Sequence, residues 1–211
     1  MENPWKTIRL SDYEAHMRLD TMRQLQTLNS MMREQFSAYP AESVMILGVA
    51  GGNGLEHIDP AKYAAVYAVD VNPEYLRETE ARFPGLRGCL HCICADLTAE
   101  NTGLPHADLV IADLLIEYIG YAHFQRVLRQ TNPAHVSCVI QINTDEAQWV
   151  SDSPYLHAFD GLDAVHCQME EDALEAAMKA VGYSAFFRAS ESLPNGKALV
   201  RLDYAAIGQR A

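Results

Sequence analysis

The fold of this protein is decided by one stretch of its sequence, Ile46-Leu47-Gly48-Val49-Ala50-Gly51-Gly52-Asn53-Gly54. The stretch belongs to an apolar run that starts at Val44, and a short apolar run ending in glycines is typical of a buried strand in a parallel sheet. Glycines at this point let the backbone turn tightly and approach a ligand closely, because they carry no Cβ. We therefore predict a ligand site at the loop from Gly48 to Gly54.

Two further strands are predicted downstream, and each is followed by an acid. Asp70 ends the strand at 65–69, and Asp96 ends the strand at 89–95. A carboxylate in the first position can accept hydrogen bonds from two ribose hydroxyls, while the second could meet an exocyclic amine or a backbone amide. One such acid is often only a helix N-cap. The glycine loop and both acids, at adjacent strand ends, together indicate a nucleoside site.

Strand and helix patterns continue to alternate to the end of the chain. The pattern predicts, in order, helix 73–82, strand 107–112, helix 121–130, strand 136–142, helix 170–181 and strands 184–192 and 197–204. The last two strands are joined through Leu193-Pro194-Asn195-Gly196, which is a hairpin signal. We predict an α/β fold with a doubly wound, mostly parallel sheet and an antiparallel C-terminal hairpin.

The segment before the first strand has a helical pattern over residues 7–38. Its apolar side chains recur at spacings of three and four, and Ser11-Asp12 is a suitable N-cap. We predict a single domain over residues 1–211, with 1–40 as a helical cap and 41–211 as the α/β core.

The cap also suggests a function. We predict that Trp5–Phe36 is a mobile lid over the strand ends, with Tyr13 and His16 facing inward, because water-excluding lids favour group transfer. The alternative is a plain packing helix with a frayed start.

Composition narrows the possible partners. The net charge of −12 makes a nucleic-acid partner unlikely, since such binding depends on Lys and Arg contacts with phosphates. No apolar run reaches the roughly 18 residues that span a bilayer, so no membrane partner is expected. The N-terminus lacks a signal-peptide pattern, and we expect a cytoplasmic protein.

The chain has five cysteines, and this odd number indicates free thiols rather than a set of disulfides. Cys89-Leu90-His91-Cys92-Ile93-Cys94 lies in a predicted strand without a second ligand pair, so we predict packing residues and no metal site.

Two nucleotide-binding motifs do not fit the glycine loop. G-x-G-x-x-G fails because His57 stands three residues beyond Gly54, and the phosphate loop fails because no Lys follows Gly54. A ligand without phosphates needs neither motif.

At this point the sequence resembles the class I S-adenosylmethionine-dependent methyltransferases. The segments 46–54, 66–72, 94–97 and 107–119 look like the four motifs of that family, in order. The resemblance implies a seven-stranded sheet with a reversed last strand, S-adenosylmethionine as the cofactor and methyl transfer as the activity. We expect these residues to contact the cofactor: Tyr13, Gly48, Ala50, Gly51, Gly52, Asn53, Gly54, Asp70, Val71, Asn72, Asp96, Leu97, Asp113 and Leu114.

The sequence departs from the family pattern in two places. Gly48 stands where the family usually has an acid, which leaves open how the methionine amino group is held, and Ala50 replaces a glycine. After the fourth strand the chain reads Ala112-Asp113-Leu114-Leu115-Ile116-Glu117-Tyr118, without the Asn-Pro-Pro-Tyr of many amine-methylating members.

Methyl transfer depends chiefly on alignment of the acceptor, so no catalytic motif is required. Asp113, Glu117, Tyr118 and His123 follow the fourth strand, and Tyr118 is our candidate for the catalytic residue. A small-molecule acceptor is the favoured partner. A methyltransferase of protein or nucleic acid and a non-catalytic S-adenosylmethionine-binding domain are the alternatives. The acceptor atom and the oligomeric state stay open.

Overall fold

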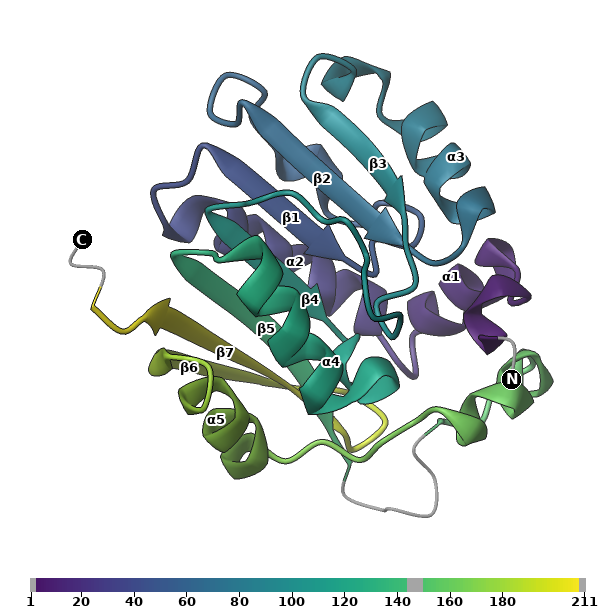
Figure 1. Ribbon diagram of the computed structural model, residues 1–211. Coiled ribbons are helices and arrows are strands. Elements are labelled where there is room, and N and C mark those ends of the chain that lie inside the picture. The colour runs from purple at the N-terminus through teal and green to yellow at the C-terminus, as the bar shows by residue number, and fades with distance from the viewer. Residues whose placement is uncertain (1–2, 144–149, 209–211) are drawn as a thin grey trace.

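The computed structural model describes residues 3–143 and 150–208, and its centre is a seven-stranded sheet in the order β3-β2-β1-β4-β5-β7-β6 (Figure 1). The strands are β1 Ser43–Leu47, β2 Ala65–Asp70, β3 Leu90–Cys94, β4 Leu109–Asp113, β5 His135–Ile142, β6 Tyr183–Ser192 and β7 Ala198–Ala206. Strands β1 to β5 are parallel, and β7 pairs antiparallel with both β5 and β6. The predicted α/β fold with its C-terminal antiparallel hairpin is confirmed.

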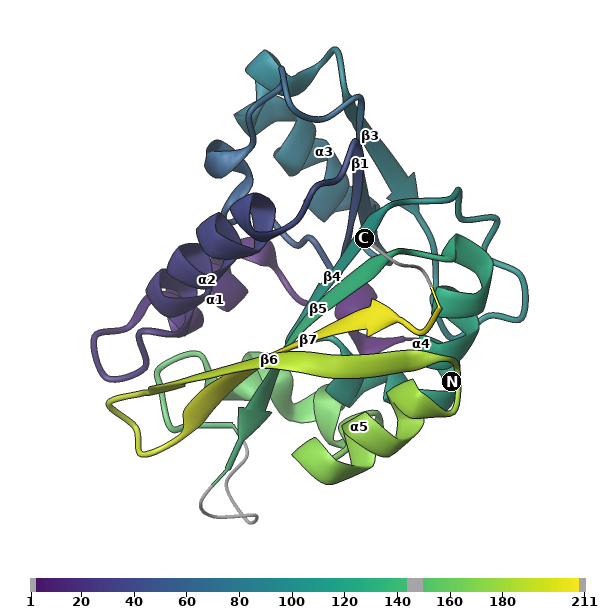
Figure 2. The ribbon, with the colours of Figure 1, turned by 90° about the vertical axis from the view of Figure 1, so that its left-hand side faces the viewer.

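Helices cover both faces of the sheet, as Figure 2 shows with α2 on one side and α4 and α5 on the other. The α-helices are α1 Leu10–Arg18, α2 Gln24–Ala38, α3 Pro73–Arg82, α4 Ile116–Thr131 and α5 Glu171–Lys179. The short 3-10 helices are η1 Pro4–Lys6, η2 Leu55–His57, η3 Pro84–Leu86 and η5 Leu156–Ala164.

The alternation of side chains along β1 divides the core in two. Met45 and Leu47 pack with residues of α4 and α5, while Val44 and Ile46 pack with residues of α2 and α3. Successive side chains of a strand point to opposite faces, so a continuous apolar run is what a strand covered on both faces requires.

The site lies at the edge of the sheet where β1 to β4 end. Strand β1 pairs with β2 on one side and β4 on the other, so the chain reverses its winding direction there. The register places Leu47 beside both Val69 and Ala112. Gly48 therefore starts a loop flanked by Asp70 and Asp113, at the switch point where ligands of doubly wound folds bind.

The predicted single helix over residues 7–38 is wrong. The segment forms α1 and α2, separated at residues 19–23, and Arg23 has a left-handed φ of 55°. Met22, at 1% exposure, is buried below this turn, so the apolar spacing continues through the break and hides it. The predicted N-cap is also wrong, because Arg9 occupies that position and Ser11 lies inside α1.

The helix predicted at 121–130 starts earlier than expected. It belongs to α4, which begins at Ile116 and is interrupted at Gly120, where φ is 74° and ψ is 163°. The first turn of α4, which precedes this break, carries Glu117 and Tyr118.

In the part of the chain that the structure describes, no helix is long and apolar enough to cross a membrane. Within 3–143 and 150–208, no three His, Cys, Asp or Glu side chains converge as metal ligands do. The cysteines at 89, 92, 94, 138 and 167 are free thiols.

Candidate functional site

A cavity of about 660 Å³ opens at the carboxyl ends of β1 to β4. We call it the first cavity, and its lining includes the predicted residues Tyr13, Gly48, Ala50, Asp70, Val71, Asp96, Leu97, Asp113, Leu114 and Tyr118. The other lining residues are Asn3, Trp5, Tyr75, Ala95, Leu115 and Ile119.

The first half of the glycine loop forms part of this wall. The amides of Gly48 and Val49 donate to the Val69 carbonyl over 2.8 and 3.1 Å, which ties the loop to the end of β2. Gly48 and Ala50 have left-handed φ values of 70° and 48°. A left-handed alanine is strained, and strain of this kind tends to gather at ligand sites.

The second half of the loop packs against helices instead. A Cβ on Gly52 would lie 2.6 Å from the Phe83 ring, and one on Gly54 would lie 2.7 Å from the Met32 sulfur. Neither glycine lines the first cavity. Gly51 and Asn53 line a smaller neighbouring cavity that also touches Gly48, Ala50 and Asp113.

Asp70 is fixed by the backbone. Its Oδ2 accepts from the Ala50 amide over 2.9 Å, and its Oδ1 accepts from the Asn72 amide over 2.9 Å. Burial raises the pKa of this carboxyl, although both amide bonds oppose the shift. Asn72 itself does not line the first cavity, because its side chain caps α3 at Glu74 and donates to the Trp5 carbonyl.

Asp96 and Leu97 lie at the end of β3. Asp96 accepts from both the amide and the hydroxyl of Thr98, over 3.0 and 2.6 Å. Burial alone would raise the pKa of Asp96, but these hydrogen bonds outweigh it and lower the pKa. Asp96 thus caps a turn, and Leu97, at 5% exposure, supplies an apolar surface beside it.

Aromatic rings close the other side of the first cavity. The Trp5 ring meets the rings of Tyr13 and Tyr118 edge to face, at centroid distances of 5.7 and 4.9 Å. Leu114, with a left-handed φ of 52°, completes this wall. Figure 1 shows the N-terminal segment that carries Trp5 and Tyr13 beside the arrowheads of β2 and β3.

A second cavity of about 560 Å³ lies next to the first and shares four of its lining side chains, Trp5, Tyr13, Leu114 and Tyr118. The second cavity lies between the N-terminal helices, the first turn of α4, η5 and the start of β7. Its further lining residues are His16, Met17, Gln24, Glu117, Gln141, Val150, Ser151, Phe159, Leu162, His166 and Lys197. Tyr13 lines both cavities, and His16 lines the second. His123 lines neither cavity, and its Nδ1 lies 2.6 Å from the Ile119 carbonyl.

Burial changes the protonation of the polar groups in the second cavity. It lowers the pKa of His16 and of His166 to about 4, so both imidazoles are neutral at pH 7. Burial also lowers the pKa of Lys197 to about 8 and raises the pKa of Glu117 to about 8.

Sequence reasoning did not identify several of these residues. Lys197 and His166 follow the last parallel strand and reach the site only through the tertiary fold, so no local signal marks them. Gln35 did carry a signal, because it falls three and four residues after Met32 and Met31, on the apolar face of α2. Its side-chain amide nitrogen, Nε2, donates to Asp113 Oδ1 over 2.9 Å.

No protein-family model matches this sequence, and no curated protein matches it. Solved structures do match its fold. NodS, an N-methyltransferase from Bradyrhizobium japonicum WM9 in complex with S-adenosylhomocysteine, aligns with a TM-score of 0.66 at 11% identity, over 97% of this chain and 99% of that one. The magnesium protoporphyrin IX methyltransferase ChlM from Synechocystis PCC 6803, with bound S-adenosylmethionine, aligns with a TM-score of 0.63 at 11% identity, over 96% of this chain and 89% of that one.

The chain has the class I S-adenosylmethionine-dependent methyltransferase fold. The resemblance seen in the four sequence motifs is thereby confirmed at the level of the fold. The [4+2]-cyclase SpnF also aligns, with a TM-score of 0.66 at 10% identity, over 90% of this chain and 84% of that one. Proteins of more than one activity therefore share this architecture.

Proposed function

We propose that this protein is an S-adenosylmethionine-dependent methyltransferase that acts on a small molecule. The observation that carries the proposal is the first cavity, in which Asp70 is fixed by the glycine loop at the switch point of the sheet. Neighbours of the same fold hold S-adenosylmethionine or S-adenosylhomocysteine.

The residues of the first cavity suit the parts of this cofactor. Each oxygen of Asp70 accepts one backbone amide and keeps a second lone pair, which can accept from a ribose hydroxyl. Val71 and Leu97 offer apolar surface for adenine, and Asp96 stands at the same end of the cavity. When bound, the cofactor supplies an electrophilic methyl group on a sulfonium.

We place the acceptor in the second cavity. It shares the wall of Trp5, Tyr13, Leu114 and Tyr118 with the first cavity, so an acceptor there would lie next to the cofactor. The N-terminal helices and η5 line this cavity, and their apolar side chains pack together around Phe159 and Leu162. The net charge of −12 disfavours nucleic acid as the acceptor.

The protein's own contribution to the reaction is alignment and exclusion of water. Holding two reactants in line can supply about 7–11 kcal/mol of the barrier. Burial raises the pKa of Tyr118 well above its usual value, so its hydroxyl stays protonated and can orient an acceptor by donating a hydrogen bond. Tyr118 therefore acts as an orienting donor at the shared wall rather than as a base.

Two experiments test the proposal in sequence. Isothermal titration of the wild-type protein with S-adenosylmethionine and S-adenosylhomocysteine should show saturable binding of both, and no binding would refute the proposal. Tritiated methyl from S-adenosylmethionine should then pass to a metabolite fraction, and not to protein or RNA fractions. Labelling of protein or RNA would favour a polymer acceptor. Binding without transfer to any fraction would favour a non-catalytic domain.

A further inference from the structure

Three carboxylates line the first cavity, and they differ in the hydrogen bonds that their oxygens accept. Both oxygens of Asp70 accept backbone amides, and Asp96 is held by Thr98. Asp113 Oδ1 accepts from Gln35, while Asp113 Oδ2 is shielded from solvent and has no hydrogen-bond partner among the described residues. A buried carboxylate oxygen without a donor is costly, and a ligand that brings a donor would remove that cost.

The position of Asp113 in the sheet matters as well. Leu47 pairs with Ala112, so the next residues, Gly48 and Asp113, stand side by side where β1 and β4 end. Gly48 could not easily supply a carboxylate itself, because its φ is left-handed and a Cβ there would lie 3.1 Å from the Leu115 side chain. The acid at this junction therefore comes from β4.

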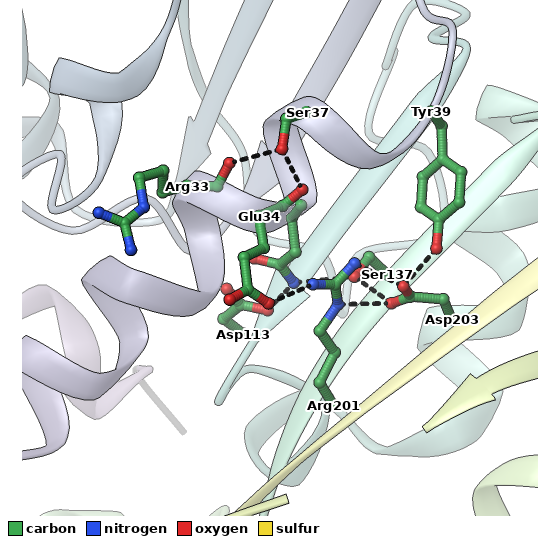
Figure 3. Close-up of polar contacts among 9 residues, drawn as sticks. Arg33, Glu34, Ser37, Tyr39, Asp113, Ser137, Arg201 and Asp203 are labelled. Carbon is green, nitrogen blue, oxygen red and sulfur yellow. Dashed lines mark hydrogen bonds and ion pairs between the residues drawn. The ribbon is translucent and has the colours of Figure 1, made fainter. Parts of the chain in front are cut away.

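Asp113 is held in place by a buried polar network that crosses the sheet (Figure 3). Gln35 Nε2 donates to Asp113 Oδ1 and to Ser137 Oγ, over 2.9 Å in each case, and Ser137 donates to Asp203. Arg201, at 3% exposure, donates to both carboxylate oxygens of Asp203 over 3.0 and 2.6 Å. Because Gln35 must serve two acceptors at once, its amide fixes Oδ1 of Asp113 and leaves Oδ2 for a ligand.

The surroundings of Asp113 also favour a cationic ligand. Burial raises the pKa of Asp113 to about 7, and Asp203 on β7 adds to the shift while Arg201 opposes it. Glu117 on α4, Tyr13 on α1 and the Cys138 thiol on β5 are further titratable groups that interact with this carboxyl. A cation beside Oδ2 would stabilise the ionised carboxylate.

We infer that Asp113 binds the α-ammonium group of the cofactor, and that Gln35 is the residue that positions it. This inference rests on the proposed function, since it concerns the same cofactor. An ammonium group carries three donors and a positive charge, which match an unpartnered carboxylate oxygen in a shielded place. The network from Arg201 to Gln35 then has a role in binding as well as in folding.

The test compares two ligands that differ only in the amino group. Wild-type protein should bind S-adenosylhomocysteine about 10- to 100-fold more tightly than its analogue without the α-amino group, the scale of a hydrogen bond between charged groups. Asp113→Asn should remove this preference by weakening S-adenosylhomocysteine alone. Gln35→Ala should reduce the preference, while Asp96→Asn, a matched loss of charge in the same cavity, should leave it unchanged.

The outcomes separate this inference from the proposed function. Equal affinity of the wild-type protein for both ligands would overturn the inference and leave cofactor binding intact. Equal weakening of both ligands by Asp113→Asn would also overturn it. Failure of the wild-type protein to bind S-adenosylhomocysteine would refute both. The wild-type comparison needs no substitution, so it decides the question even if Asp113→Asn does not fold.

Discussion

The two cavities lie side by side, but they are built in different ways. The first cavity is formed by strand ends and by a loop whose amides are bound to β2 and Asp70. The second cavity is formed largely by η1, α1 and η5, which pack on one another around Ile8, Phe159 and Leu162. The sheet therefore fixes the groups that we assign to the cofactor, while helical additions to the sheet form the cavity in which we propose that the acceptor binds.

This difference suggests a division of labour. Atoms held by backbone hydrogen bonds at strand ends are already in place when a ligand arrives, which keeps the ordering cost of binding low. Side chains on a cap of short helices can change without disturbing the sheet. We expect substitutions in the first cavity to change cofactor affinity, and substitutions in the second to change stability or turnover.

The largest effect is expected for Glu117→Gln in the second cavity. Burial raises the pKa of the Glu117 carboxyl to about 8 in the folded protein, from an ordinary pKa of 4.5. Between these values the native state holds a proton that the unfolded chain has released, so the free energy of unfolding falls as pH rises. The fall is about 1.4 kcal/mol for each unit by which the native pKa exceeds the unfolded one.

Urea unfolding at pH 5 and pH 8 measures this effect. Wild-type protein should lose more stability over that interval than Glu117→Gln, and the variant should bind S-adenosylhomocysteine as the wild type does. Identical pH dependence of the two proteins would show that Glu117 is not buried as described. A large loss of cofactor affinity would show that the two cavities are not separate in function.

Asp70→Ala should give the next largest effect, in the first cavity. We expect S-adenosylhomocysteine binding to weaken by about 1.5–3 kcal/mol, the range for hydrogen bonds that involve a charged group. Lys197→Met, in the second cavity, is the control and should leave this affinity unchanged. Calorimetry on both variants measures the difference, and an unchanged affinity for Asp70→Ala would remove it from the ribose site.

Tyr118→Phe tests the wall that the two cavities share. Loss of one hydrogen bond of about 0.5–1.5 kcal/mol should lower turnover by a few-fold to about tenfold. The ring remains, so its contact with Trp5 and the affinity for S-adenosylhomocysteine should be preserved. Full turnover of the variant in the tritium assay would exclude the hydroxyl from the reaction.

The smallest effect is expected for Glu14→Gln, which changes a contact between the N-terminal cap and the core. Arg82 of α3 forms a two-pronged ion pair with Glu14 of α1, in which Nη2 donates to Oε2 over 3.2 Å. The Arg82 side chain is 36% exposed and the Glu14 side chain 15% exposed, so Glu14→Gln should cost about 1 kcal/mol of stability, the upper end of the range for surface ion pairs.

Proteolysis reveals whether this contact controls a lid. Bonds near Arg9 and Arg18 should be protected by S-adenosylhomocysteine, and Glu14→Gln should be cut faster than the wild type without ligand. Equal cleavage with and without ligand would favour the plain packing helix.

The same division explains what the sequence could predict. Strand ends follow directly from apolar runs, so Gly48, Asp70, Asp96 and Asp113 could be placed at one edge of the sheet from the order of residues alone. Gly52 and Gly54 could not be separated from the other glycines, because their role depends on contacts with Phe83 and Met32 that come from distant segments. The break between α1 and α2 was hidden by an apolar spacing that continues through it.

The second cavity could not be predicted from local patterns. His166 and Lys197 come together with Trp5 and His16 only when four separate segments pack at one place. Polar residues on an apolar helix face are the exception, since Gln35 shows that such a residue can mark a buried network.

The most direct test of the central claim is a crystal structure of the complex with S-adenosylhomocysteine. We predict that the ligand occupies the first cavity, with its ribose hydroxyls on Asp70, its amino group on Asp113 and its sulfur toward the wall of Trp5, Tyr13, Leu114 and Tyr118. A ligand bound in the second cavity, or one whose ribose does not meet Asp70, would contradict the account.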